Sequence, residues 1–164
     1  LMKIIKHYEG LHDGDLKQIG LQPKMCPVGV WTEGWGHAMI GTDGKFLRGI
    51  GNKDKALKLA KIKTIAEADK QLLADLSPIL LIIQRKIKFP LTENQVDALA
   101  SFIYNTGGSS TLYNLINTKS ADLYNWWCSH YITGQGSTKP LPGLIYRRKT
   151  EAQFFTTGKL EFFN

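Results

Sequence analysis

Residues 26–37 read CPVGVWTEGWGH and crowd a thiol, a hydroxyl, a carboxylate, two indoles and an imidazole among three glycines. Glycine weakens a helix and marks tight turns and close backbone approaches, so this stretch is predicted to be a strand bounded by turns. Alternation along the strand puts Thr32 on one face with Gly34 and Gly36, and the tryptophans and the glutamate on the other. The face that carries Thr32 is then nearly bare, which allows a ligand or another backbone to approach its hydroxyl closely.

Upstream, residues 1–10 read LMKIIKHYEG, which predicts a short helix with an apolar stripe from Leu1 to Tyr8 and a stop at Gly10. Glu9 falls in the last turn of this helix. A carboxylate is unfavourably placed at the negative end of the helix dipole. Two interpretations remain open from this stretch alone: a helix end that faces solvent, or an acid kept in an unfavourable place for chemistry.

The rest of the chain indicates the fold class. Residues 10–52 are rich in glycine with short alternating runs, which predicts a small hairpin-based sheet. Thr64 followed by Glu67 predicts the start of a long helix that Pro78 bends or breaks, and further helices are predicted for residues 92–106, 110–117, 120–131 and 141–155. The fold class is therefore α+β, with a β-rich lobe at about 10–55 and a helical lobe at about 56–164 plus helix 1–9, joined by the long helix.

Composition limits the function. Hydrophobic residues make up 43% and charged residues 21% of the chain, which is typical of one globular domain. The formal net charge of +7 favours an anionic partner, whether nucleic acid, anionic lipid or an acidic cell-wall polymer. A nucleic-acid binder is disfavoured because no recognition-helix or RNP-like motif is present. The sequence has no closely spaced cysteines and histidines of the kind that would predict a metal site, and no apolar run is long enough to span a bilayer.

The chain resembles the phage-type lysozymes, or endolysins, of glycoside hydrolase family 24 in several segments that occur in the same order. The family pattern is a Glu that ends a helix, eight residues, an Asp or Cys, five residues and a Thr, within E-G…C-P-A-G-V-W-T-I-G-Y-G-H. Here YEG supplies Glu9, and CPVGVWT supplies Cys26 with five residues before Thr32. LTENQVDALASFIYNTG and LPGLIYRRKTEAQFF are similar to two further family segments, so the resemblance covers nearly the whole chain.

The resemblance implies a lysozyme-like fold, with residues 1–164 as a single muramidase domain, and catalysis by Glu9, Cys26 and Thr32. Cleaving a glycosidic bond needs an acid for the leaving oxygen and a group opposite that activates water or takes the sugar. Glu9 is then the acid. Cys26 and Thr32 position the water or act as nucleophile, and Cys26 acts mainly by placement because a thiol is mostly protonated at neutral pH. No disulfide is expected between Cys26 and Cys128, which fall in different predicted lobes.

Other residues receive roles from their places in the family motifs. The expected substrate contacts are Gly34, Trp35 and Asn105, the last through an N-acetyl group. The expected structural residues are His37 and Asp75, which form a salt link between the lobes, and Arg147 and Arg148. Ion pairs of the two arginines are expected to close the C-terminal lobe, and their charge to attract the wall polymer.

Two departures from the family pattern leave alternatives open. Sixteen residues separate Glu9 from Cys26, where the family has eight. The extra residues are interpreted as an extended hairpin, since loop insertions cost little free energy. Asp13 and Asp15 in this segment are alternative second carboxylates. Glu33 replaces a usually aliphatic residue, and strand alternation places it outside the catalytic group.

The resemblance also implies the substrate and the place of action. The expected reaction is hydrolysis of the β-1,4 bond between N-acetylmuramic acid and N-acetylglucosamine in peptidoglycan, leading to bacterial lysis, by a monomer without metal or cofactor. The alternative is a non-catalytic peptidoglycan-binding module on the same fold. Neither a nucleic-acid partner nor stable membrane insertion is expected. The enzyme would reach the wall from the host cytoplasm by holin-dependent release, or by secretion to the periplasm, although no signal segment is visible.

Overall fold

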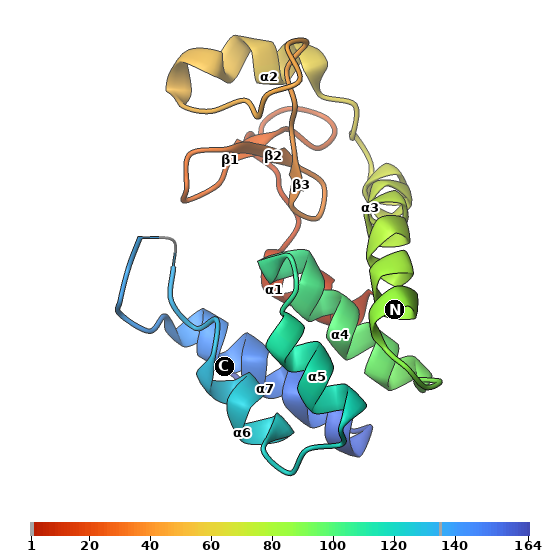
Figure 1. The fold of residues 1–164 in the computed structure, drawn as a ribbon. Helices are drawn as coiled ribbons and strands as arrows, with labels where there is room; N and C mark the ends of the chain where they lie inside the picture. Colours follow the sequence, from red (N-terminus) through yellow and green to blue (C-terminus); the bar gives the residue numbers. More distant parts are fainter. Residues whose placement is uncertain (1, 135) are drawn as a thin grey trace. The chain divides into compact units, whose positions relative to one another are not determined.

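The computed structural model describes residues 2–134 and 136–164 and is dominated by helices, with one small sheet (Figure 1). The elements in chain order are α1 Lys3–Glu9, β1 Lys24–Met25, β2 Trp31–Glu33, β3 His37–Ala38, the 3₁₀ helix η1 Ile50–Asn52, α2 Lys53–Leu59, α3 Ile65–Lys86, α4 Glu93–Thr106, α5 Ser110–Asn117, α6 Leu123–Ser129 and α7 Pro142–Thr157. The α+β class expected from the sequence is confirmed. Leu1, expected on the apolar stripe of the first helix, lies outside the described residues. None of the helices in the described ranges is both long and apolar enough to cross a membrane.

The chain divides into two compact units, here called the sheet unit (residues 9–75) and the helical unit (residues 2–8 with 76–164). The sheet unit extends to Asp75, whereas the sequence suggested a β-rich region that ends near residue 55. The physical reason is that α2, the first half of α3 and the segment between them add buried side chains to it, among them Ala56, Ile62 and Ala68.

The three strands form an antiparallel sheet in the order β1-β2-β3. Thr32 in β2 lies opposite Lys24 on one side and opposite Ala38 on the other. Strands of two or three residues carry few ladder bonds, so the cohesion of the unit depends on side-chain packing. All three residues of β2 are buried, and a core cluster packs around this strand, formed by Trp31, Met39, Leu47 and Ala56.

Glu33, at the end of β2, is a buried carboxylate. Its side chain is 6% exposed, and its Oε2 accepts the backbone N–H groups of Lys61 and Ile62, both at 3.0 Å. A carboxylate removed from water requires such donors. The two bonds hold the segment that leads into α3 against the strand, so Glu33 has a structural use outside the catalytic group.

The long helix α3 begins with the predicted capping box. Glu67 Oε2 accepts the N–H of Thr64 at 3.0 Å, and Thr64 Oγ1 accepts the N–H of Glu67 at 3.2 Å. Pro78 lies inside the helix, which continues past it, so the expected break at this residue is wrong. Buried side chains on both sides of the proline, Leu76 and Ile79, keep the adjoining turns packed, and packing of this kind supplies most helix stability in proteins.

In the helical unit, α4 and α6 pack against α7. The predicted ends of α4 are present. Gln95 accepts the N–H of Thr92 at 3.0 Å, and the helix ends at Gly107, whose φ of 81° suits glycine. Phe102 and Trp127 are fully buried and meet edge to face, with ring centroids 5.6 Å apart.

A buried carboxylate organises the polar part of this core. Glu151 is 0% exposed and lies 3.1 Å from Arg147 Nε and 3.2 Å from Arg148 Nε. Its two oxygens also accept hydrogen bonds from Ser101 Oγ at 2.6 Å and from Trp127 Nε1 at 3.2 Å. The arginines therefore join helices within the helical unit. Both side chains are buried, so they are not placed to contact a wall polymer directly, and attraction of the polymer by their charge stays a prediction.

Replacing Glu151 by Gln is expected to lower the free energy of unfolding by about 3 kcal/mol or more, since removing one partner of a buried ion pair leaves uncompensated charge. Equilibrium urea unfolding of the purified variant measures this. The matched control is Glu161→Gln, an exposed glutamate whose replacement should change stability by less than about 0.5 kcal/mol. A loss no larger than that of the control would show that Glu151 does not neutralise the two arginines.

Candidate active site

The candidate acid, Glu9, is the last residue of α1, and Gly10 follows it with a φ of 70°. The Glu9 side chain is half-buried and lies against the backbone of Gly36. A Cβ added to Gly36 would stand 3.1 Å from Glu9 Oε2, which is tighter than nine in ten real Cβ contacts. Gly36 therefore leaves the space that the carboxylate occupies, and we call this contact the Glu9 seat.

Thr32 lies in the middle strand and is 6% exposed. Its Oγ1 donates to the backbone carbonyl of Lys24 at 2.9 Å, and it lies 3.1 Å from Nδ1 of His12. His12 is itself attached to the neighbouring backbone, because its N–H donates to the carbonyl oxygen of Gly34 at 2.8 Å. The hydroxyl expected to work on the substrate thus belongs to a local hydrogen-bonded group.

His12 was missed by the sequence analysis, which considered only Asp13 and Asp15 as functional candidates between Gly10 and Cys26. Burial lowers the pKa of His12 below its ordinary value of 6.5; nearby Lys24 acts in the same direction, and Glu9 opposes it. The imidazole is therefore neutral at neutral pH, and its pKa responds to the charge of the candidate acid, Glu9. The signal that was present is the spacing, since an imidazole three residues after a candidate acid can share its site.

Cys26 begins the turn that joins β1 to β2. Its N–H donates to Val30 O and its carbonyl accepts from Gly29 N–H, both at 2.8 Å. The thiol is half-buried and is free, as is that of Cys128. A catalytic part for this thiol stays a prediction.

The alternative carboxylates Asp13 and Asp15 both shape the longer segment. Asp13 Oδ1 accepts the N–H groups of Asp15 at 3.3 Å and Gln22 at 3.2 Å. Asp15 accepts from Lys17 N–H and from the Gln18 amide, both at 3.0 Å. The segment is a closed loop of turns and bends, so the expected extended hairpin is wrong. Local carboxylate bonds of this kind compete with a regular strand ladder.

The strand alternation that was expected to place Thr32, Gly34 and Gly36 on one open face ends at the turn after β2. Gly34 has a φ of 59°, which ends the strand pattern, and it is buried. A Cβ on Gly34 would meet Ile62 Cδ1 at 2.9 Å and Ala68 Cβ at 3.3 Å. The predicted substrate contact at Gly34 is therefore wrong, because α3 and the segment before it cover this position. Trp35 donates its indole N–H to Asp69 Oδ1 at 2.7 Å and remains half-buried.

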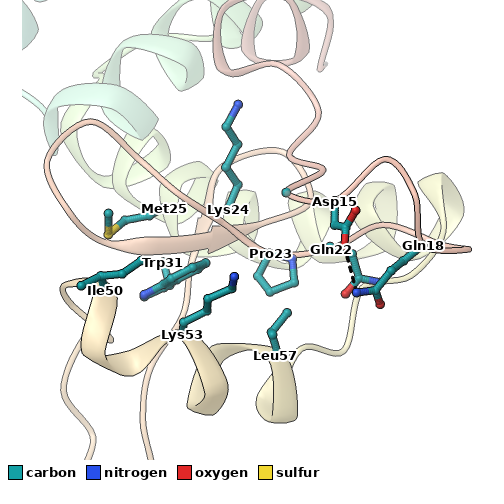
Figure 2. Close-up of a pocket in the computed structure, with 11 residues that line it drawn as sticks. Asp15, Gln18, Gln22, Pro23, Lys24, Met25, Trp31, Ile50, Lys53 and Leu57 are labelled. Atoms are coloured by element: carbon teal, nitrogen blue, oxygen red, sulfur yellow. Dashed lines mark hydrogen bonds between the residues drawn. The ribbon is translucent and has the colours of Figure 1, made fainter.

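A pocket of about 280 Å³ lies on the other side of the strand (Figure 2). Trp31 and Met25, which pair across β1 and β2, both line it. Figure 2 shows the Lys24 side chain pointing away from Trp31, as expected for the residue paired with Thr32. Trp31 thus lines the pocket from the face of β2 opposite to Thr32, and neither Glu9 nor Thr32 is among the lining residues.

His37 and Asp75 are in contact, with Nδ1 2.9 Å from Oδ2, and Gln71 Nε2 donates to Asp75 Oδ1 at 2.8 Å. The hydrogen bond to Asp75 raises the pKa of His37 above its ordinary value of 6.5, although burial opposes the shift. The pair links β3 to α3 inside the sheet unit. It therefore fastens the end of the turn that carries the Glu9 seat.

Asn105, in the helical unit, is exposed near the end of α4. Its Oδ1 accepts a hydrogen bond from Arg148 at 2.8 Å. This bond leaves the amide N–H₂ group as the part of Asn105 suited to a ligand carbonyl. A substrate contact at Asn105 stays a prediction.

Solved structures with the same architecture define the class of the fold. The endolysin from Escherichia coli O157:H7 phage FAHEc1 matches with a TM-score of 0.68 at 26% identity, covering 98% of this chain and 92% of that chain. The muramidase domain of SpmX from Asticaccaulis excentricus matches with a TM-score of 0.62 at 29% identity, covering 95% of this chain and 94% of that chain. The fold is therefore lysozyme-like.

The sequence comparison is more specific. The phage lysozyme family model matches residues 14–151, and an endolysin of Acyrthosiphon pisum secondary endosymbiont phage 1 is 30% identical over 164 residues, covering 94% of each chain. The chain therefore belongs to the phage lysozyme family. Its activity is that of a peptidoglycan hydrolase of the lysozyme class.

Replacing Asp75 by Asn is expected to destabilise the protein more at about pH 5.5 than at about pH 8.5. The folded-state pKa of His37 is raised, so the charged pair contributes fully below the unfolded value of 6.5 and is lost as pH rises through the folded value. Melting temperatures at both pH values test this. Asp43→Asn, at an exposed aspartate, is the control and should show no such difference. Equal losses for Asp75→Asn at both pH values would contradict a charged pair.

Proposed function

We propose that this enzyme cleaves the β-1,4 bond between N-acetylmuramic acid and N-acetylglucosamine with Glu9 as general acid. One observation carries the proposal: the Glu9 carboxylate is seated against Gly36 in the unit that also holds Thr32 and its partner His12. Membership of the phage lysozyme family supports it. The reaction requires no metal, and the residues named here are an acid and two groups able to hold water.

In the proposed reaction, Glu9 gives its proton to the glycosidic oxygen as the bond to the anomeric carbon breaks. Water attacks from the opposite side of the sugar, held by the Thr32 hydroxyl with Cys26 at the neighbouring turn. Trp35 and Asn105 are proposed substrate contacts, and Asn105 would bind the carbonyl of an N-acetyl group.

The wall polymer fits the charge of the chain. The formal net charge is +7, and Lys53, Lys55 and Lys58 of α2 are all exposed. Exposed cations of this kind attract an anionic wall without specifying a sequence of sugars. In this proposal the enzyme acts as a monomer and as one catalytic domain, and reaches the wall by holin-dependent release or by secretion.

Replacing Glu9 by Gln is expected to reduce the rate of peptidoglycan hydrolysis by about 10²–10⁴-fold, the usual contribution of a general acid. The amide keeps the shape of the side chain but has no proton to give. The measurement is the release of reducing ends from purified peptidoglycan, with circular dichroism to show that the fold is retained. Glu161→Gln, far from this chemistry in the sequence, is the matched control and should keep the wild-type rate.

Two outcomes would count against the proposal. If Glu9→Gln kept more than about a tenth of the wild-type rate, Glu9 would not be the general acid. If the wild type bound peptidoglycan and released no reducing ends, the chain would be a binding module on a lysozyme-like fold.

Replacing Cys26 by Ala is expected to lower activity at least about tenfold if the thiol positions water. Cys26→Asp should keep measurable lysis, because the family pattern has Asp or Cys at this place. Cys128→Ala is the matched control: this thiol lies in α6, where burial raises its pKa, and its loss should affect stability alone. Full activity of Cys26→Ala would remove Cys26 from the catalytic group.

A further inference from the structure

His12 is held in place at two points. Its backbone N–H bonds to Gly34 O at 2.8 Å, and its half-buried ring lies with Nδ1 3.1 Å from Thr32 Oγ1. The first contact is backbone to backbone and does not depend on the side chain. Replacing the ring therefore leaves this attachment of the segment to the turn after β2 in place.

The protons of this group can be counted. The Thr32 hydroxyl has one proton, and its two partners are the carbonyl oxygen of Lys24 at 2.9 Å and His12 Nδ1. A carbonyl oxygen can only accept, so both bonds form together only when Thr32 donates to Lys24 and His12 Nδ1 donates to Thr32. This arrangement requires a proton on Nδ1.

Two charged groups act on the pKa of His12: Glu9 at the end of α1 raises it, and Lys24 in β1 lowers it. Burial lowers the pKa of His12, so the ring is neutral at neutral pH. A neutral ring carries one proton only. If that proton is on Nδ1, then Nε2 carries a lone pair.

We propose that His12 is a positioning residue that fixes the orientation of the Thr32 hydroxyl, and thereby the lone pair with which Thr32 holds the attacking water. A free hydroxyl rotates about its Cβ–Oγ bond. The Thr32 hydroxyl donates its proton to Lys24 O, and one of its two lone pairs accepts the proton of His12 Nδ1. Only the second lone pair is then left to bind a water molecule, in one fixed direction. Orientation of this kind reduces the entropy lost in reaching the transition state. The proposal rests on the part given to Thr32 under the proposed function.

Kinetics on a soluble peptidoglycan oligomer test the proposal. His12→Ala should lower kcat at least about tenfold with little change in KM, because orientation matters in the transition state. His12→Asn should recover most of kcat, since its amide N–H can donate from nearly the position of Nδ1, whereas His12→Gln should not. A merely structural role would not separate Asn from Gln in this way, and equal rates for the two variants would overturn the proposal.

A double-mutant cycle provides the second arm. If His12 acts through Thr32, the double variant His12→Ala with Thr32→Val should be no slower than Thr32→Val alone. Independent, multiplying losses would overturn the proposal. Failure of the proposed function is a separate result, since it would show as an active Glu9→Gln variant whatever the His12 variants do.

The tautomer gives a test that needs no active variant. Long-range ¹H–¹⁵N spectra of the wild-type protein above pH 7 should show His12 with Nδ1 protonated and Nε2 unprotonated. The Thr32→Val variant removes the acceptor and should weaken this preference. A wild-type spectrum with the proton on Nε2 would overturn the assignment, even if the kinetic variants failed to fold.

Discussion

The buried carboxylate of Glu33 is the constraint on which the sheet unit depends. A carboxylate taken out of water must be given donors, and here these are the backbone N–H groups of Lys61 and Ile62 at 3.0 Å. The chain is thereby brought back to β2 just before α3 begins. Because a helix advances regularly, fixing its start also fixes which of its side chains meet the strand and the turn after it.

Those side chains follow in order along α3. Ala68 closes over Gly34, Asp69 binds the indole of Trp35, and Asp75, two turns after Ala68, binds the imidazole at the start of β3. The turn between β2 and β3 is therefore fastened at several points. The Glu9 seat lies within this turn, so a buried carboxylate outside the catalytic group helps to fix the place of the acid.

Local signals in the sequence were sufficient for both ends of α4, because caps such as Thr92 and Gly107 act within one turn of the chain. They failed at Gly34, whose left-handed backbone ended the strand alternation and turned the expected open face toward α3. Local signals could not predict the partners of Glu33, because these are backbone N–H groups, which nearly every residue type has. His12 was overlooked because a segment of unusual length was treated as a connection, although its polar groups complete the surroundings of Thr32.

The lack of a side chain at Gly36 has a consequence for how local unfolding would affect the candidate acid. In the Glu9 seat the carboxylate packs against the backbone of Gly36. The residues on either side, Trp35 and His37, are hydrogen-bonded to Asp69 and Asp75 of α3. Amide exchange in such a turn proceeds by opening of the element that holds it. Transient unwinding of the first half of α3 therefore removes the backbone position against which the Glu9 carboxylate packs.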